Sequence, residues 1–114
     1  MTGYFGVREA SGVLDPLYAS ALAISDGDET LVMMSCDLLA IDGALVAQAR
    51  ELIQERWGIP GKNIMIHATH IHTGPATRVD AREVGPYAIM KRDEPYLAML
   101  VRKLADAAHI ALSN

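Results

Sequence analysis

The sequence predicts an α/β domain with a mixed sheet, in which a β-hairpin is followed by a right-handed β-α-β crossover and a C-terminal helix. An apolar run at 30–36 is followed by an amphipathic helical stripe at 42–57 and then by a second apolar run at 63–69. Because a strand, a helix and a strand in this order close as a right-handed crossover, the two strands should be parallel. With 114 residues, of which 51 % are hydrophobic, the chain is sized for a single domain with a real core.

Composition and charge narrow the classes of function. The net charge is −4 and acidic and basic residues are mixed along the chain, so nothing indicates a surface for nucleic acid. No apolar stretch approaches the ~20 residues of a membrane-spanning helix, so we expect no transmembrane segment. The first residues do not resemble a signal peptide; the protein is then cytoplasmic, or it is secreted or periplasmic with its signal peptide outside this chain. The single cysteine, Cys36, is expected to be a small core residue, with a reactive thiol as the alternative.

The β-hairpin is predicted before the crossover. After a glycine-rich, polar loop at 1–16, residues 17–25 are apolar and small, the Asp-Gly-Asp-Glu sequence at 26–29 supplies a tight turn, and the second strand follows at 30–36. This second strand is apolar on both faces, as expected for a strand buried within a layered sheet. Three methionines of the strand patterns are therefore expected in the core: Met33, Met34 and Met65.

Both helices carry start and stop signals. Asp42 is a good N-cap and Gly58 a stop for the first helix. Its apolar residues recur at steps of three and four: Leu45, Val46, Ala49, Leu52, Ile53 and Trp57. For the C-terminal helix, Asp93 or Glu94 can cap and Pro95 suits the first turn. Its apolar stripe comprises Leu97, Leu100, Val101, Leu104 and Ala108.

A histidine cluster follows the last predicted strand. His67, His70 and His72 lie directly before a Gly-Pro pair that turns the backbone. In an extended chain, residues two apart point to the same side, so His70 and His72 can converge while His67 points away. Three interpretations remain open: metal binding or catalysis by His70 and His72, surface histidines in a turn, or buried hydrogen-bonded histidines. The fourth histidine, His109, lies off its apolar stripe and is expected at the surface.

The crossover places a carboxylate beside this cluster. Asp37 ends the first parallel strand. Since parallel strands direct their carboxyl ends to one edge, where open α/β sheets bind ligands, Asp37 and His70 should share a rim. Asp37 either orients an imidazole or caps backbone in the turn after its strand; these alternatives stay open. Residues 76–92 have no periodicity and follow the cluster directly, so we expect them to border a substrate entrance and to be mobile when nothing is bound.

The cluster also carries a family resemblance. The run Ala68-Thr-His-Ile-His-Thr-Gly-Pro75 resembles the Thr-His-Thr-His-Ser-Gly-Pro motif of neutral, non-lysosomal ceramidases and their bacterial relatives. Two further stretches are similar and occur in the family's order: the Gly-Tyr and Asp-Pro-Leu-Tyr-Ala sequences within 3–19, and Ser35-Cys-Asp-Leu-Leu39. The resemblance covers most of the chain and is weakest at 76–92. The chain departs from the family pattern in having Ile71 for threonine, Thr73 for serine, and Ala76 where ceramidases often have glycine.

The resemblance implies a zinc-dependent amidohydrolase of sphingolipid metabolism. In that family a zinc-activated water attacks an N-acyl amide, releasing a fatty acid and an amine. Matched to the family motif, His70 is expected to be a zinc ligand and His72 a catalytic residue beside the reacting carbonyl. We add Asp37 as a second catalytic candidate. The family's further ligands, a later histidine, a glutamate and a tyrosine, fall at positions beyond residue 114, so we expect this chain to match the front part of the family domain, completed by a missing chain or a partner. The alternative function is a non-catalytic α/β fragment or binding domain without a complete metal site.

Overall fold

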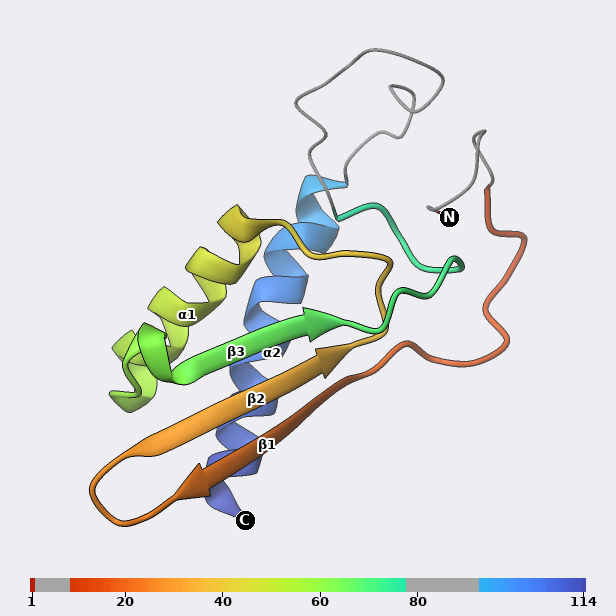
Figure 1. Ribbon diagram of the computed structural model, residues 1–114. Helices are drawn as coiled ribbons and strands as arrows, with labels where there is room; N and C mark the ends of the chain where they lie inside the picture. The colour runs from red at the N-terminus through yellow and green to blue at the C-terminus, as the bar shows by residue number, and fades with distance from the viewer. Residues whose placement is uncertain (2–8, 78–92) are drawn as a thin grey trace.

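The computed structural model describes residues 1, 9–77 and 93–114. The three strands form one mixed sheet in the order β1-β2-β3, in which β1 is antiparallel to β2 and β2 is parallel to β3. Both long helices lie on the same face of this sheet (Figure 1). The elements in chain order are β1 (Ala19–Ser25), β2 (Thr30–Cys36), α1 (Gly43–Trp57), the short 3-10 helix η1 (Gly61–Asn63), β3 (Ile64–Ala68) and α2 (Glu94–Ser113). The predicted α/β class, hairpin, crossover and C-terminal helix are confirmed.

Helix α1 begins and ends at the predicted signals. The carboxylate of Asp42 accepts a hydrogen bond of 2.8 Å from the backbone N–H of Ala44, which satisfies a donor in the first turn. At the other end Gly58 adopts a left-handed conformation with φ of 72°, and its N–H bonds the carbonyl of Gln54 at 2.9 Å. A residue with a Cβ would be strained there, which explains why a glycine ends the helix.

Helix α2 also follows its sequence signals. Asp93 is the N-cap, because its carboxylate accepts from the N–H of Tyr96 at 3.1 Å, and Pro95 occupies the first turn. All five residues of the predicted apolar stripe are buried, and Ala105 is buried as well. His109 is exposed, as expected, and its ring stacks on that of Trp57 from α1 with centroids 5.0 Å apart.

The side chain of Asp26 stabilises the hairpin turn between β1 and β2. One oxygen of Asp26 accepts hydrogen bonds from the N–H groups of Asp28 at 3.0 Å and Glu29 at 2.9 Å. Gly27 supplies the left-handed residue, with φ of 103°, that lets the chain reverse. The backbone donors of Glu29 and Asp28 stabilise the charged form of Asp26 and lower its pKa below the ordinary value.

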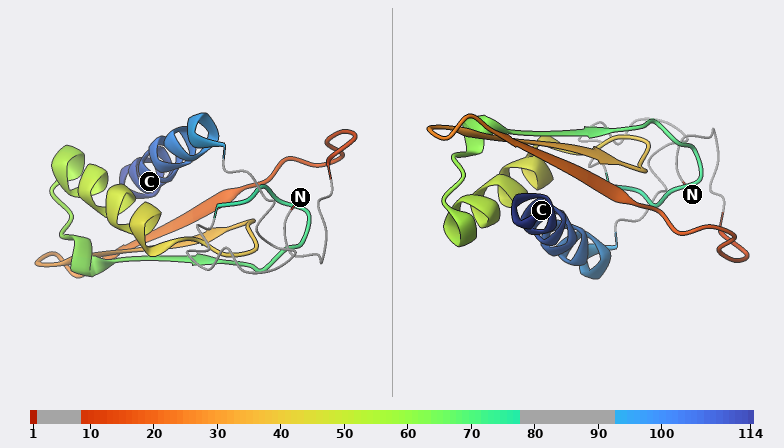
Figure 2. Two further views of the ribbon diagram at one scale, coloured as in Figure 1. Left: turned by 90° about the horizontal axis from the view of Figure 1, so that it is seen from above. Right: turned by 90° about the horizontal axis from the view of Figure 1, so that it is seen from below.

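The core lies between the sheet and the helices, so one face of the sheet is covered. The inward side chains of β2 and β3 are almost fully buried: Val32, Met34, Cys36 and Ile64. Met33 and Met65, which the sequence placed in the core, are instead 41 % and 45 % exposed, so that expectation is wrong. The physical reason is visible in Figure 2: within the part of the chain that the structure describes, no element packs on the second face of the sheet.

Residues 78–92, which make up most of the segment expected to border a substrate entrance, lie outside the described residues. Among the helices that the structure does describe, none is long and apolar enough to cross a membrane.

Candidate functional site

The parallel crossover brings the ends of β2 and β3 together, as the sequence predicted. Cys36 and Ala68 are partners in the register. Just beyond them, the backbone N–H of Thr69 bonds the carbonyl oxygen of Cys36 at 2.9 Å, and the Thr69 hydroxyl lies 3.4 Å from Oδ1 of Asp37. The segments that carry Asp37 and His70 therefore share one rim of the sheet.

His70 is held in an unusual backbone conformation. Its φ is 66°, and it is the one non-glycine residue with a positive φ in the described parts of the chain. A histidine in the left-handed region costs on the order of 1 kcal/mol or more, and such strain persists only where the surroundings enforce it. Here the backbone N–H of His70 bonds the carbonyl oxygen of Leu38 at 2.9 Å. The segment after β2 thus holds His70 in place through its backbone.

The same segment also fixes the imidazole of His70. Its Nδ1 lies 2.9 Å from the carbonyl oxygen of Leu39. Because a carbonyl oxygen can only accept, Nδ1 carries the proton, and the lone pair of the neutral ring is on Nε2. Metal-binding histidines characteristically donate their second ring nitrogen to a carbonyl or carboxylate in this way. This geometry leaves Nε2 available and is compatible with metal binding through that nitrogen.

His72 lies next to His70. The two ring centroids are 5.1 Å apart, and the rings are nearly perpendicular, with an interplanar angle of 81°. The two rings are thus neighbours, but the predicted reason for this, an extended chain, is wrong, because β3 ends at Ala68 and His70 is left-handed. His67, still within β3, is exposed on the open face of the sheet, apart from the pair.

Asp37 joins three segments at the rim. Its Oδ2 accepts a hydrogen bond of 3.0 Å from the backbone N–H of Tyr18, just before β1, while Oδ1 faces the hydroxyl of Thr69 after β3. These contacts match the backbone-capping alternative that the sequence left open. A role for Asp37 in orienting an imidazole stays a prediction.

The end of the histidine motif packs against the same segment. The hydroxyl of Thr77, a buried residue, donates to the carbonyl oxygen of Ala40. Gly74 is also buried, and a Cβ at this position would lie 3.5 Å from the carbonyl oxygen of Asp37. The carbonyls of residues 36–40 therefore make up one wall of the site. Sequence reasoning missed this wall because every residue type has a carbonyl, so no side chain reveals it.

The described residues do not complete a metal site. No group of three or more His, Cys, Asp or Glu side chains that could hold a metal ion occurs among residues 1, 9–77 and 93–114. Catalytic zinc sites use three protein ligands and an open position for water. A zinc site that included His70 would need further ligands from outside the described residues.

Comparisons with models of protein families, with curated proteins and with solved structures find no match.

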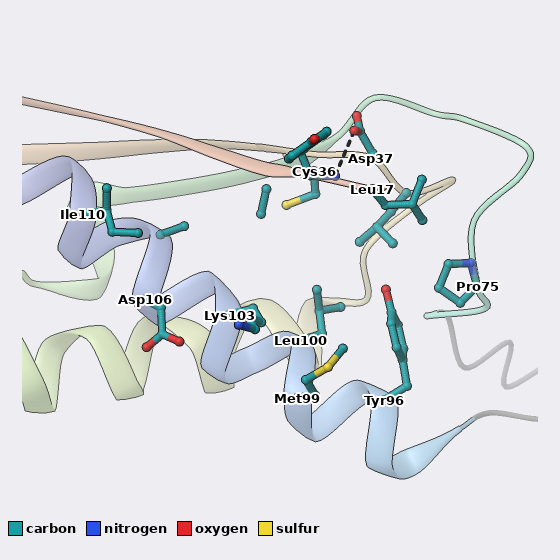
Figure 3. Close-up of a pocket in the computed structure, with 14 residues that line it drawn as sticks. Leu17, Cys36, Asp37, Pro75, Tyr96, Met99, Leu100, Lys103, Asp106 and Ile110 are labelled. Carbon is teal, nitrogen blue, oxygen red and sulfur yellow. Dashed lines mark hydrogen bonds between the residues drawn. The ribbon is translucent and has the colours of Figure 1, made fainter. Parts of the chain in front are cut away.

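A largely apolar cavity of about 450 Å³ adjoins the rim, between α2 and the ends of β1 and β2 (Figure 3). This volume is typical of sites for small molecules. Asp37 and Pro75 line the end nearer the histidine motif, whereas Ile110 lies at the other end. Its apolar wall includes Leu17, Tyr96, Met99 and Leu100.

The surroundings of the cysteine in this cavity wall disfavour a nucleophilic thiol. Cys36 is 1 % exposed, as the expectation of a core residue requires. Burial, with a smaller contribution from the charge of Asp37, raises the pKa of its thiol to about 11. The thiol is protonated at neutral pH, which disfavours the alternative of a reactive cysteine.

Proposed function

We propose that this domain belongs to a zinc-dependent amidohydrolase of the ceramidase type, which hydrolyses an N-acyl amide to a fatty acid and an amine. The observation that carries the proposal is the hydrogen bond from Nδ1 of His70 to the carbonyl oxygen of Leu39. With Nδ1 as the donor, the lone pair of the neutral ring is on Nε2, where a zinc ion could bind. The left-handed conformation of His70 supports the same role, since strained backbone is concentrated at functional sites.

The position of His72 supports a role for this residue in assisting the reaction. Its ring lies beside that of His70 and is half-buried. An imidazole in such a place can donate a hydrogen bond to the oxygen of an amide carbonyl as negative charge develops there. Zinc, when bound, supplies a water of lowered pKa as the nucleophile.

The cavity supports a lipid-like substrate. Its wall is mainly aliphatic and aromatic, and its end at Asp37 and Pro75 is close in the fold to the histidine motif. An acyl chain buried there would be stabilised by about 0.8 kcal/mol per methylene group removed from water. A polar amine of the same size would gain little from this wall.

One observation favours a second candidate, a binding domain without catalytic activity. The described residues contribute one well-oriented ligand and no set of three. If no other residues join His70, a bound zinc ion would keep mostly water ligands and its geometry would not be fixed. Metal content and turnover distinguish the two candidates.

The test is a zinc titration of the chain and of two histidine variants, followed by assays against a short-chain ceramide and a simpler N-acyl amide. His70→Ala should abolish zinc binding. His67→Ala is the matched control, because His67 is an exposed histidine of the same motif on the open face of the sheet, and this variant should bind zinc as the unaltered chain does. Equal binding by the His70→Ala variant would contradict the proposal. Tight stoichiometric binding with turnover would rule out the second candidate.

A further inference from the structure

Among the residues that the structure describes, no strand pairs with the outer edge of β1, so this edge can form hydrogen bonds with another strand. In the antiparallel pair of β1 and β2, the N–H of Asp37, just after β2, bonds the carbonyl of Tyr18, just before β1. In the turn at the other end, the N–H of Asp26 bonds the carbonyl of Glu29. Since residues alternate along an antiparallel ladder, the even-numbered residues of β1 bond to β2. The odd-numbered ones direct their N–H and C=O groups outward: Ala19, Ala21, Ala23 and Ser25.

This edge lacks the features by which natural sheets avoid pairing. Edge strands are usually short or carry charges, proline or a bulge. β1 has seven residues, all of them uncharged and none of them proline. The opposite edge differs: β3 has five residues, and the carbonyl oxygen of Ile64 accepts hydrogen bonds from Nε and Nη2 of Arg50 at 2.9 and 2.7 Å.

The C-terminal end of helix α2 lies near the same edge and carries an exposed apolar residue. In Figure 1 the C-terminal end of α2 lies past β1, and Figure 2 agrees with this placement. Ile110, in the last turns of α2, is 62 % exposed. A strand added beside β1 would extend the sheet over this end of the helix and cover Ile110. The incoming strand needs small inward side chains to leave room for the helix, and β1 itself has Ala21 and Ala23 at such positions.

We propose that β1 pairs with β1 of a second copy of this chain in antiparallel orientation, which joins two three-stranded sheets into one. The strand is self-complementary about Leu22. In the register that pairs all seven residues, Ala21 lies opposite Ala23 of the second copy in a hydrogen-bonded pair, and Ala19 lies opposite Ser25. Leu22 then lies opposite Leu22 in the closer, non-hydrogen-bonded type of pair, and no charged side chain meets another of the same sign.

The contact area determines how tight this dimer is. Seven residues at ~3.4 Å each, in a sheet about 10 Å thick, give a contact on the order of a few hundred Å² per copy. This is smaller than the ~800 Å² per partner of stable complexes. The dimer should therefore dissociate on dilution, so its population must be measured over a range of concentrations.

The experiment is sedimentation velocity of the full chain from micromolar to millimolar concentration, with two lysine variants. Leu22→Lys places two ammonium groups opposite each other at the centre of the pairing and should weaken dimerisation about tenfold or more. Met33→Lys is the matched control, because Met33 is the partner of Leu22 on β2 and points to the same open face, but lies one strand away from the edge. It should leave the dimer intact. Mixing Leu22→Lys with Leu22→Glu chains should restore dimers.

The other outcomes overturn the proposal. A chain that stays monomeric at millimolar concentration does not use this edge. Equal loss of dimers in the Leu22→Lys and Met33→Lys variants would mean that copies associate through the open face. Amide hydrogen exchange gives an independent measurement on the unaltered chain. Raising the concentration should protect the N–H groups of Ala21 and Ala23, which bond nothing in β2, and unchanged exchange at both would refute pairing at this edge.

Discussion

The strain at His70 can be measured by comparing two substitutions at one position. Both His70→Ala and His70→Gly remove the imidazole and its hydrogen bond to Leu39, so in the folded state they differ mainly in the cost of the left-handed backbone. At a φ of 66° alanine is strained and glycine is not. We expect the glycine variant to be more stable than the alanine variant by about 1 kcal/mol, even though glycine gives the unfolded chain more freedom.

The same pair of substitutions at His67 provides the control. His67 lies in the extended strand β3, where glycine has no steric advantage. There the glycine variant should be less stable than the alanine variant by about 0.5–1 kcal/mol, because only its extra flexibility in the unfolded state matters. Urea unfolding at equilibrium measures all four free energies. If alanine at position 70 proved as stable as glycine, the backbone of His70 would not be strained, and this support for a functional role would be lost.

Three further predictions concern the fold. Asp42→Ala should lower the free energy of unfolding by about 1 kcal/mol through loss of the α1 cap. Asp42→Asn should keep most of the stability, because asparagine can also cap the helix. Equal urea midpoints for the unaltered chain and both variants would show that the cap contributes nothing. Leu104 is 0 % exposed, so Leu104→Ala should lower the free energy of unfolding by about 2–5 kcal/mol. Met99→Ala, at a partly exposed position on the same helix, is the control. A loss of stability in Leu104→Ala no larger than that in Met99→Ala would contradict the observed core. In the folded protein the pKa of the Cys36 thiol is raised from 9.0 to about 11. Unfolded chains therefore lose the thiol proton at lower pH than folded chains do, and the free energy of unfolding should fall as the pH rises from about 9 to about 11. Cys36→Ala should remove this pH dependence, and identical pH profiles of stability for the two proteins would contradict the raised pKa.

Sequence predicted the local features of the fold well. The ends of α1 follow from Asp42 and Gly58 because capping depends on groups within one helical turn. The parallel crossover follows from the order of the elements, and it brought Asp37 and His70 to one rim. Cys36 and Met34 were correctly placed in the core because both belong to the inward side of β2.

Features that depend on distant parts of the chain were not predictable. Met33 and Met65 look like core residues in sequence, but burial on both faces requires a layer of structure on each, and within the described residues the second layer is absent. The conformation of His70 depends on the carbonyl groups of Leu38 and Leu39, whose positions follow from the chain path after β2. Residue type carries no information about such backbone contacts.

Zinc binding at Nε2 of His70 can be observed directly by nitrogen NMR of the imidazole rings. Without metal, the spectrum should show His70 as the neutral tautomer protonated at Nδ1. Adding zinc should shift Nε2 of His70 toward the range of a metal-bound nitrogen and leave both nitrogens of His67 unchanged. A tautomer protonated at Nε2, or zinc-induced shifts that are absent at His70 or equal at His67, would contradict the assignment of His70 as the zinc ligand.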